Sequence, residues 1–226
     1  SDDTNTTIDF PGSDVIQFFT SGSERMRIVN DGAVRISTTS EPDGSADGVQ
    51  IRPFGGNTKF SRDATGLRDH LLFYNPNGLV GRIQTNGSAT SYVTSSDYRL
   101  KEAVVDMTGA IARVKQLAPK RFNFIADDSV TLDGFLAHEA QAVVPEAVNG
   151  THNEVETWTQ QEIDDGDAPD GTSAGDNKLD GDGNTIPAYQ GIDQSKLVPL
   201  LTGALQEAIA KIETLETKVA ALEAAE

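Results

Sequence analysis

The chain has 226 residues, 37% of them hydrophobic, and a formal net charge of −17 from 35 acidic and 18 basic side chains. This length and composition suffice for one or two modest hydrophobic cores. The negative charge repels nucleic acid phosphates and anionic membranes, so we expect no nucleic acid partner. No apolar run approaches the ~20 residues of a membrane span, so we expect no membrane insertion. The sequence contains no cysteine, which removes disulfides and thiolate chemistry.

Residues 1–95 are predicted to be rich in β-strands, because short β-prone runs alternate with turn residues. One hairpin is predicted around Asn30-Asp31-Gly32, and a second one around residues 75–78, between 71–74 and 79–83. The strands are short and broken by polar residues, so the apolar content is thin for a monomeric sandwich. Several copies packed around one axis would be more stable, and a small β-sandwich is the alternative.

Residues 96–149 are predicted to form a small α+β unit. Thr108 is expected to cap a helix that runs through Leu117, and 121–124 alternates like a strand. A second short helix is expected over 138–144, ended by Pro145. The following segment, 150–191, is acidic and rich in glycine, and it can bury little apolar surface.

The last zone, 193–226, is predicted to be helical, with Asp193 as its N-cap. Apolar residues recur at two heptad positions, which is typical of a coiled coil. One position holds Val198, Leu205, Ile212 and Val219, and the other holds Leu201, Ala208, Leu215 and Leu222. Charges at the flanking positions match between chains, as they do in parallel oligomers. The alternative is an amphipathic helix that docks on its own domain.

The candidate catalytic residues lie within residues 95–102. Ser96 and Lys101 are a possible nucleophile and base, because a serine hydroxyl needs a neighbouring group to take its proton and a lysine can do so when it is neutral. Arg99 can supply positive charge or steady an oxyanion, and Asp97 can orient Arg99 or hold the turn. Ser95 competes with Ser96 as the nucleophile, and the spacing does not separate them.

Metal and cofactor signals are weaker. Residues 180–184 imitate the start of a calcium loop, but Thr185 and Gly191 stand where such a loop requires glycine and glutamate. His70 and His152 have no ligand-like neighbours at metal spacing, and a short amphipathic helix explains His138 beside Glu139. We therefore expect no cofactor and no dedicated metal site.

Five segments together resemble the C-terminal intramolecular chaperone domain of phage tailspikes, tail fibres and endosialidases, a self-cleaving serine peptidase family. In chain order they are 95–102, 117–124, 134–139, 144–148 and 192–201. The resemblance covers nearly all of 96–226. It implies a homotrimer whose chaperone domain brings three chains into register and then releases itself. It also implies cleavage of the Ser95–Ser96 bond, with Ser96 as nucleophile, Lys101 as base, and Asp97, Arg99 and Glu102 in support.

The expected fold is therefore mixed: a β-rich trimeric fibre stem over 1–95, then a small α+β chaperone domain over 96–226. That domain comprises a core (96–149), an acidic insert (150–191) and a C-terminal coiled-coil helix (193–226). The resemblance makes the stem the folding client and a host surface receptor a further partner. It implies a location in the virion tail fibre or tailspike, with the chaperone domain released in the host cytoplasm after assembly.

Two other functions remain open on the sequence. A trimeric structural or receptor-binding fibre tip that never cleaves would keep every chain at full length. A hydrolase acting on an external polymer would need a cleft with paired carboxylates ~5–10 Å apart, and the stem sequence offers no convincing pair.

Overall fold

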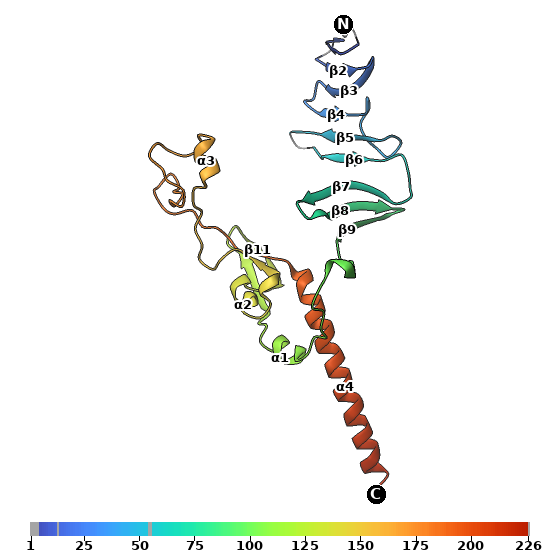
Figure 1. The fold of residues 1–226 in the computed structure, drawn as a ribbon, viewed down its shortest axis with the longest axis vertical. Helices are drawn as coiled ribbons and strands as arrows, with labels where there is room; N and C mark the ends of the chain where they lie inside the picture. Colours follow the sequence, from blue (N-terminus) through green and yellow to red (C-terminus); the bar gives the residue numbers. More distant parts are fainter. Residues whose placement is uncertain (1–4, 13, 54–55, 226) are drawn as a thin grey trace. The chain divides into compact units, whose positions relative to one another are not determined.

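The structure is a computed structural model that describes residues 5–12, 14–53 and 56–225. It is mixed and strand-rich, and it ends in a long helix (Figure 1). The chain divides into two compact units, residues 1–103 and 104–226. No helix among the described residues is long and apolar enough to cross a membrane.

The first unit consists of two antiparallel sheets in which each strand pairs with the next one in the chain. The larger sheet holds β1 (Thr7–Asp9), β2 (Ile16–Thr20), β3 (Ser23–Ile28), β4 (Val34–Ile36), β5 (Gly48–Ile51) and β6 (Lys59–Ser61). The smaller sheet holds β7 (Arg68–Asn75), β8 (Gly78–Asn86) and β9 (Ala89–Thr94). The contacts are therefore local, between neighbouring strands.

Both predicted hairpins are confirmed. Between β3 and β4, Gly32 adopts a φ of +78°, and the Val29 N–H donates to the Ala33 carbonyl at 3.0 Å. Between β7 and β8, Gly78 adopts a φ of +95°. Such positive φ values suit glycine because it lacks a Cβ, so the sequence pattern and the observed turns have one physical cause.

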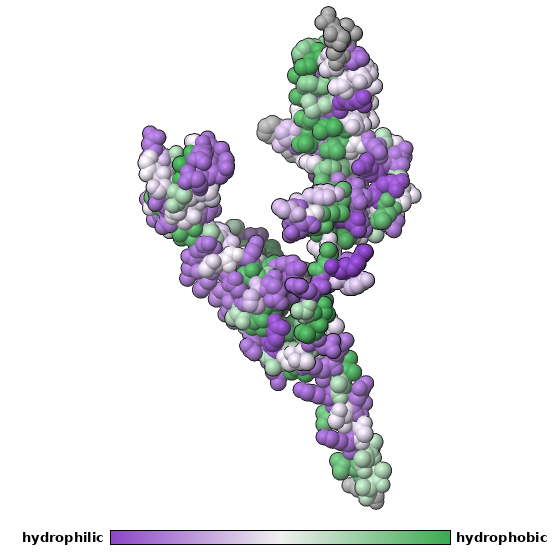
Figure 2. Space-filling model, in the orientation of Figure 1, coloured by the Kyte–Doolittle hydropathy of each residue, from purple (hydrophilic) through white to green (hydrophobic). Residues whose placement is uncertain are grey.

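The first unit buries very little apolar surface as a single chain. Among its described residues, the buried apolar side chains are only those of Ala33 and Pro42, while Gln50 is fully buried as well. Ile51, Phe60 and Phe73 remain 47%, 41% and 51% exposed. Figure 2 shows apolar surface along one face of this unit. Since burial of apolar surface is the main favourable term in folding, the isolated chain lacks most of the stabilisation that a second layer would provide.

The elements of the second unit pack around one small hydrophobic core. Its helices are α1 (Ala110–Val114), α2 (Ala137–Gln141), α3 (Gln160–Asp164) and α4 (Leu197–Glu223), and its strands are β10 (Lys120–Phe124), β11 (Asp127–Gly134), β12 (Val148–Asn149) and β13 (Gly191–Ile192). The buried cluster comprises Ala110, Val144, Ala147, Leu197 and Leu200. Residues from both ends of the unit thus meet in the core, and β12 pairs with β13 across the acidic insert.

The predicted cap of the first helix is wrong. Gly109, not Thr108, is the N-cap of α1, and it makes no side-chain capping bond. The carboxylate of Glu207 on α4 accepts hydrogen bonds from the N–H groups of Ala110 at 2.7 Å and Ile111 at 3.0 Å. These bonds hold the pKa of Glu207 below its ordinary value. A distant side chain therefore satisfies the free N–H groups that a local hydroxyl was expected to satisfy.

The C-terminal helix α4 packs on its own unit through one face and leaves another exposed. Leu197 and Leu200 are buried, and a Cβ on Gly203 would lie 3.2 Å from the Cβ of Ala110. The predicted heptad residues lie elsewhere on the helix: Leu205, Ile212, Leu215, Val219 and Leu222 are between 51% and 70% exposed. Asp193 caps a short 3-10 turn (Gln194–Lys196) that precedes α4.

The acidic insert has few regular elements but is held by specific contacts. Thr159 and Glu162 form a capping box on α3. Lys178 pairs with Glu162, and its Nζ lies 4.7 Å from the ring centroid of Trp158. Isolated bridges at Val155 and Thr157 add backbone pairing. The insert is thus fixed around one ion pair and one aromatic ring.

Acid is expected to loosen this insert. Hydrogen bonds from Lys178 and Thr159 lower the pKa of Glu162 from 4.5 to about 2. A carboxyl whose pKa is lowered by folding stabilises the folded state at pH values above its pKa in the unfolded chain. This stabilisation is therefore lost as the pH falls from 4.5 to about 2. Fluorescence of Trp158, the only tryptophan, should shift to longer wavelength over that range. Glu162→Gln should remove most of this fluorescence transition, whereas Glu156→Gln should leave it unchanged. Equal transitions in both variants would contradict the assignment of the transition to Glu162.

Candidate active site around Ser96

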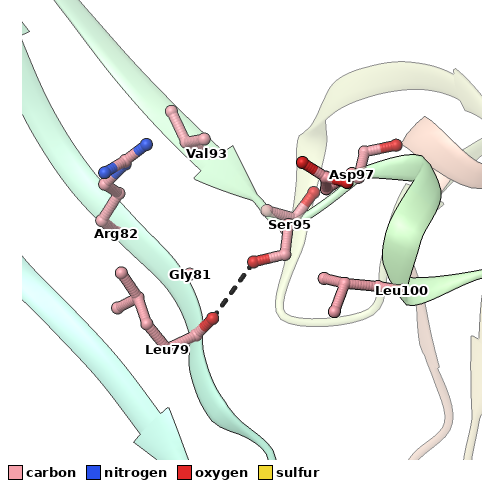
Figure 3. A pocket seen from close by; sticks show the side chains of 9 residues that line it. Leu79, Gly81, Arg82, Val93, Ser95, Asp97 and Leu100 are labelled. Carbon is pink, nitrogen blue, oxygen red and sulfur yellow. Dashed lines mark hydrogen bonds between the residues drawn. The ribbon is translucent and has the colours of Figure 1, made fainter.

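The chain leaves the smaller sheet of the first unit at Ser95. Its N–H donates to the Val80 carbonyl at 3.3 Å, and its Oγ donates to the Leu79 carbonyl at 3.1 Å. Both acceptors lie on β8, so Ser95 continues the pairing of β9 by one residue beyond Thr94. A pocket of about 330 Å³ adjoins this point, lined by residues that include Leu79, Arg82, Val93 and Leu100 (Figure 3).

Ser96 and Lys101 are in direct contact. The Lys101 Nζ donates a hydrogen bond to the Ser96 Oγ at 2.8 Å. The Ser95 Oγ binds the Leu79 carbonyl instead, so only Ser96 of the two adjacent serines has its hydroxyl bound to the lysine. A hydroxyl within hydrogen-bond reach of an amine has the geometry needed for proton transfer once the amine is neutral. Both side chains are exposed in the single chain.

A short 3-10 turn (Tyr98–Leu100) brings Lys101 back to Ser96. Asp97 caps this turn by accepting from the Arg99 N–H at 2.9 Å, and the Lys101 N–H donates to the Tyr98 carbonyl at 3.1 Å. The Arg99 guanidinium also donates to both carboxylate oxygens of Asp97, at 2.9 and 2.8 Å. These bonds hold the pKa of Asp97 below its ordinary value, so the cap stays ionised at neutral pH.

The supporting residues differ in how closely they approach the pair. Asp97 and Arg99 bind each other, and neither forms a hydrogen bond with the side chain of Ser96 or Lys101 among the described contacts. Glu102 is exposed and forms no hydrogen bond or ion pair with another described residue. Leu79 and Val80 were not predicted from the sequence, because a main-chain carbonyl acceptor leaves no signal in the residue type.

Residues outside this region have structural contacts. His138 stacks on His152, with ring centroids 4.1 Å apart, and Glu139 pairs with Lys120. His70 forms a hydrogen bond with Thr85 at 2.9 Å. Within the described ranges, no three histidine, aspartate or glutamate side chains are grouped so that they could hold a metal ion. Asp180 accepts backbone N–H bonds from Asp182 and Asn184, which accounts for the turn in the calcium-like segment.

Comparison with known families points to the same region. Residues 96–149 match a peptidase family described as the chaperone of endosialidase. Residues 96–149 are therefore similar to the intramolecular chaperone domain family, in agreement with the resemblance seen in the sequence, and the match supports a chaperone role. The matched segment begins at Ser96, the residue in contact with Lys101. A search of curated proteins gives no match to the chain.

Proposed function

We propose that this chain is an intramolecular chaperone that trimerises and folds a phage fibre or tailspike stem, and then releases itself by cutting the Ser95–Ser96 bond. The contact between the Lys101 Nζ and the Ser96 Oγ carries the proposal, because it lies at the first residue of the family match. The turn built by Asp97 and Arg99 supports this contact.

The cleavage begins with attack by Ser96 on the carbonyl carbon that precedes it. Neutral Lys101 takes the proton from the Oγ, and the new C–O bond forms on the Ser95 carbonyl carbon. The C–N bond then breaks, and the Ser96 nitrogen leaves as an amine that accepts the proton from Lys101. Ser95 is now held as an ester on the Ser96 Oγ. Hydrolysis of this ester by one water gives a Ser95 carboxylate and restores the Ser96 hydroxyl, so Ser96 becomes the new N-terminal residue with its amino group free.

Association provides both the timing and the activation. A lysine acts as a base only when neutral, and removal from water favours the neutral form. Ser96 and Lys101 are exposed in one chain, so packing of neighbouring chains around the pair would activate it. Cleavage would then follow assembly and would not precede it.

Trimerisation accounts for the two exposed apolar surfaces. The heptad residues of α4 are free to pair with copies of the same helix, because the helix contacts its own unit through a different face. The thin core of the first unit gains burial when copies pack together. A linked trimeriser raises the effective concentration of the three stems, which helps strands that otherwise pair slowly.

The expected setting is a virion tail fibre or tailspike. The stem is the folding client, a host surface receptor is the external partner, and the chaperone fragment remains in the host cytoplasm. Removing the template after folding leaves the packed stem in place and makes its unfolding kinetically difficult.

A denaturing gel tests this proposal. The wild-type chain should give two bands, for residues 1–95 and 96–226, and Ser96→Ala should give one full-length band. Ser91→Ala, which makes the same change at an exposed serine of β9, should still give two bands. One full-length band for assembled wild-type protein would instead favour a trimeric structural or receptor-binding tip that does not cleave.

A further inference from the structure

We propose that Ser95 is a positioning residue that fixes the scissile peptide to strand β8. This inference rests on the proposed cleavage, and it adds a role for the residue on the N-terminal side of the bond. The evidence is the pair of hydrogen bonds that Ser95 donates to consecutive carbonyls of β8, at Leu79 and Val80.

The two hydrogen bonds restrict Ser95 in complementary ways. The bond from the N–H holds the backbone in register with β8, and the bond from the Oγ selects one side-chain rotamer. Figure 3 shows the Ser95 side chain directed at the Leu79 carbonyl, away from the 3-10 turn that carries Leu100. In this direction the Ser95 hydroxyl is bound to Leu79 and does not compete with the Ser96 hydroxyl as the nucleophile.

The scissile bond is thus held on both sides. Upstream, Ser95 is bound to β8; downstream, the Ser96 Oγ is bound to Lys101, whose return is fixed by the capped turn at Asp97. Besides the planar peptide bond, only ψ of Ser95 and φ and χ1 of Ser96 lie between these two anchors. A nucleophile gains most when the reacting atoms are already held near their attack geometry, so losing one anchor should slow the reaction.

The upstream anchor also links cleavage to folding of the small sheet. Leu79 pairs with Tyr74 of β7, directly after the turn that contains Gly78, and the following residues of β8 pair with β9. The carbonyls that accept from Ser95 are therefore in place only when this three-stranded sheet has formed. An unfolded hairpin leaves the bond anchored on one side alone.

Substitution of Ser95 tests this role. Ser95→Ala keeps the N–H and removes the Oγ donor, so it should slow cleavage by about 3- to 10-fold, the effect expected for one exposed hydrogen bond. Ser95→Thr retains a hydroxyl and should restore the rate to within about twofold of wild type. The thermal midpoint of the stem and the dependence of cleavage on pH should stay unchanged in both variants. Ser91→Ala is the matched control.

Each outcome has a distinct meaning. A wild-type rate in Ser95→Ala, when the wild type cleaves, would overturn the positioning role and leave the proposed function intact. Equal slowing by alanine and threonine would also overturn it. Abolished cleavage in Ser95→Ala, with cleavage retained in Ser96→Ala, would make Ser95 the nucleophile. Absence of cleavage in the assembled wild type would instead reject the proposed function itself.

Discussion

Replacing Lys101 with arginine is expected to slow self-cleavage by about 100-fold or more, the usual contribution of a positioned general base. Arginine keeps the positive charge and can still donate a hydrogen bond, but it does not give up its proton in a protein. Lys101→Arg therefore keeps a positively charged hydrogen-bond donor next to Ser96 and removes the group that can accept its proton. The rate can be followed by densitometry of denaturing gels.

Lys115→Arg is the matched control for this prediction. Lys115 is an exposed lysine at the end of α1, and its substitution should leave the cleavage rate unchanged. In the wild type, cleavage should accelerate as the pH rises, because the neutral fraction of a lysine increases with pH. A Lys101→Arg variant that cleaves at the wild-type rate would show that the lysine is not the base.

Charged residues at two heptad positions of α4 are expected to abolish self-association in the micromolar range. Ile212 and Leu215 are 53% and 59% exposed in the single chain, and in a coiled coil they would lie in the seam. Ile212→Asp with Leu215→Asp would place several unpaired carboxylates in that seam, at a cost of several kcal/mol. The measurement is sedimentation of the Ser96→Ala protein, in which every chain stays intact.

The control for association changes the same charge on the opposite face. Ala210→Asp with Thr217→Asp alters two exposed residues outside the heptad seam and should leave the oligomer formed. The Ser96→Ala protein with an otherwise unchanged α4 should sediment as a species of three chains of about 24.1 kDa. If the seam variant associates as well as the control, another surface holds the chains together.

How much the sequence could predict depends on how local each interaction is. The turns at Gly32 and Gly78 were predictable because the backbone requires glycine there, whatever lies around them. The Ser96–Lys101 pair spans five residues and one capped turn, so spacing and family resemblance sufficed to suggest it. The cap of α1 was missed because its acceptor, Glu207, is 97 residues away from Ala110.

The same distinction separates the two serines of the site. The sequence alone does not distinguish Ser95 from Ser96, since both are small hydroxyl residues next to a turn. Their roles diverge through contacts made by the fold: Ser95 binds a carbonyl 16 residues earlier, and Ser96 binds the returning lysine. A main-chain acceptor such as the Leu79 carbonyl carries no identity in the sequence, so only the structure can supply it.

Intact-mass spectrometry of the assembled wild-type protein tests the central claim most directly. Cleavage by a lysine-assisted Ser96 predicts two products whose masses sum to that of the chain plus one water, the larger beginning with an unmodified Ser96. Its formation should follow assembly, and the product should be absent from Ser96→Ala. A single 24.1 kDa species that persists in the trimer, or a cut at any other bond, would contradict the account.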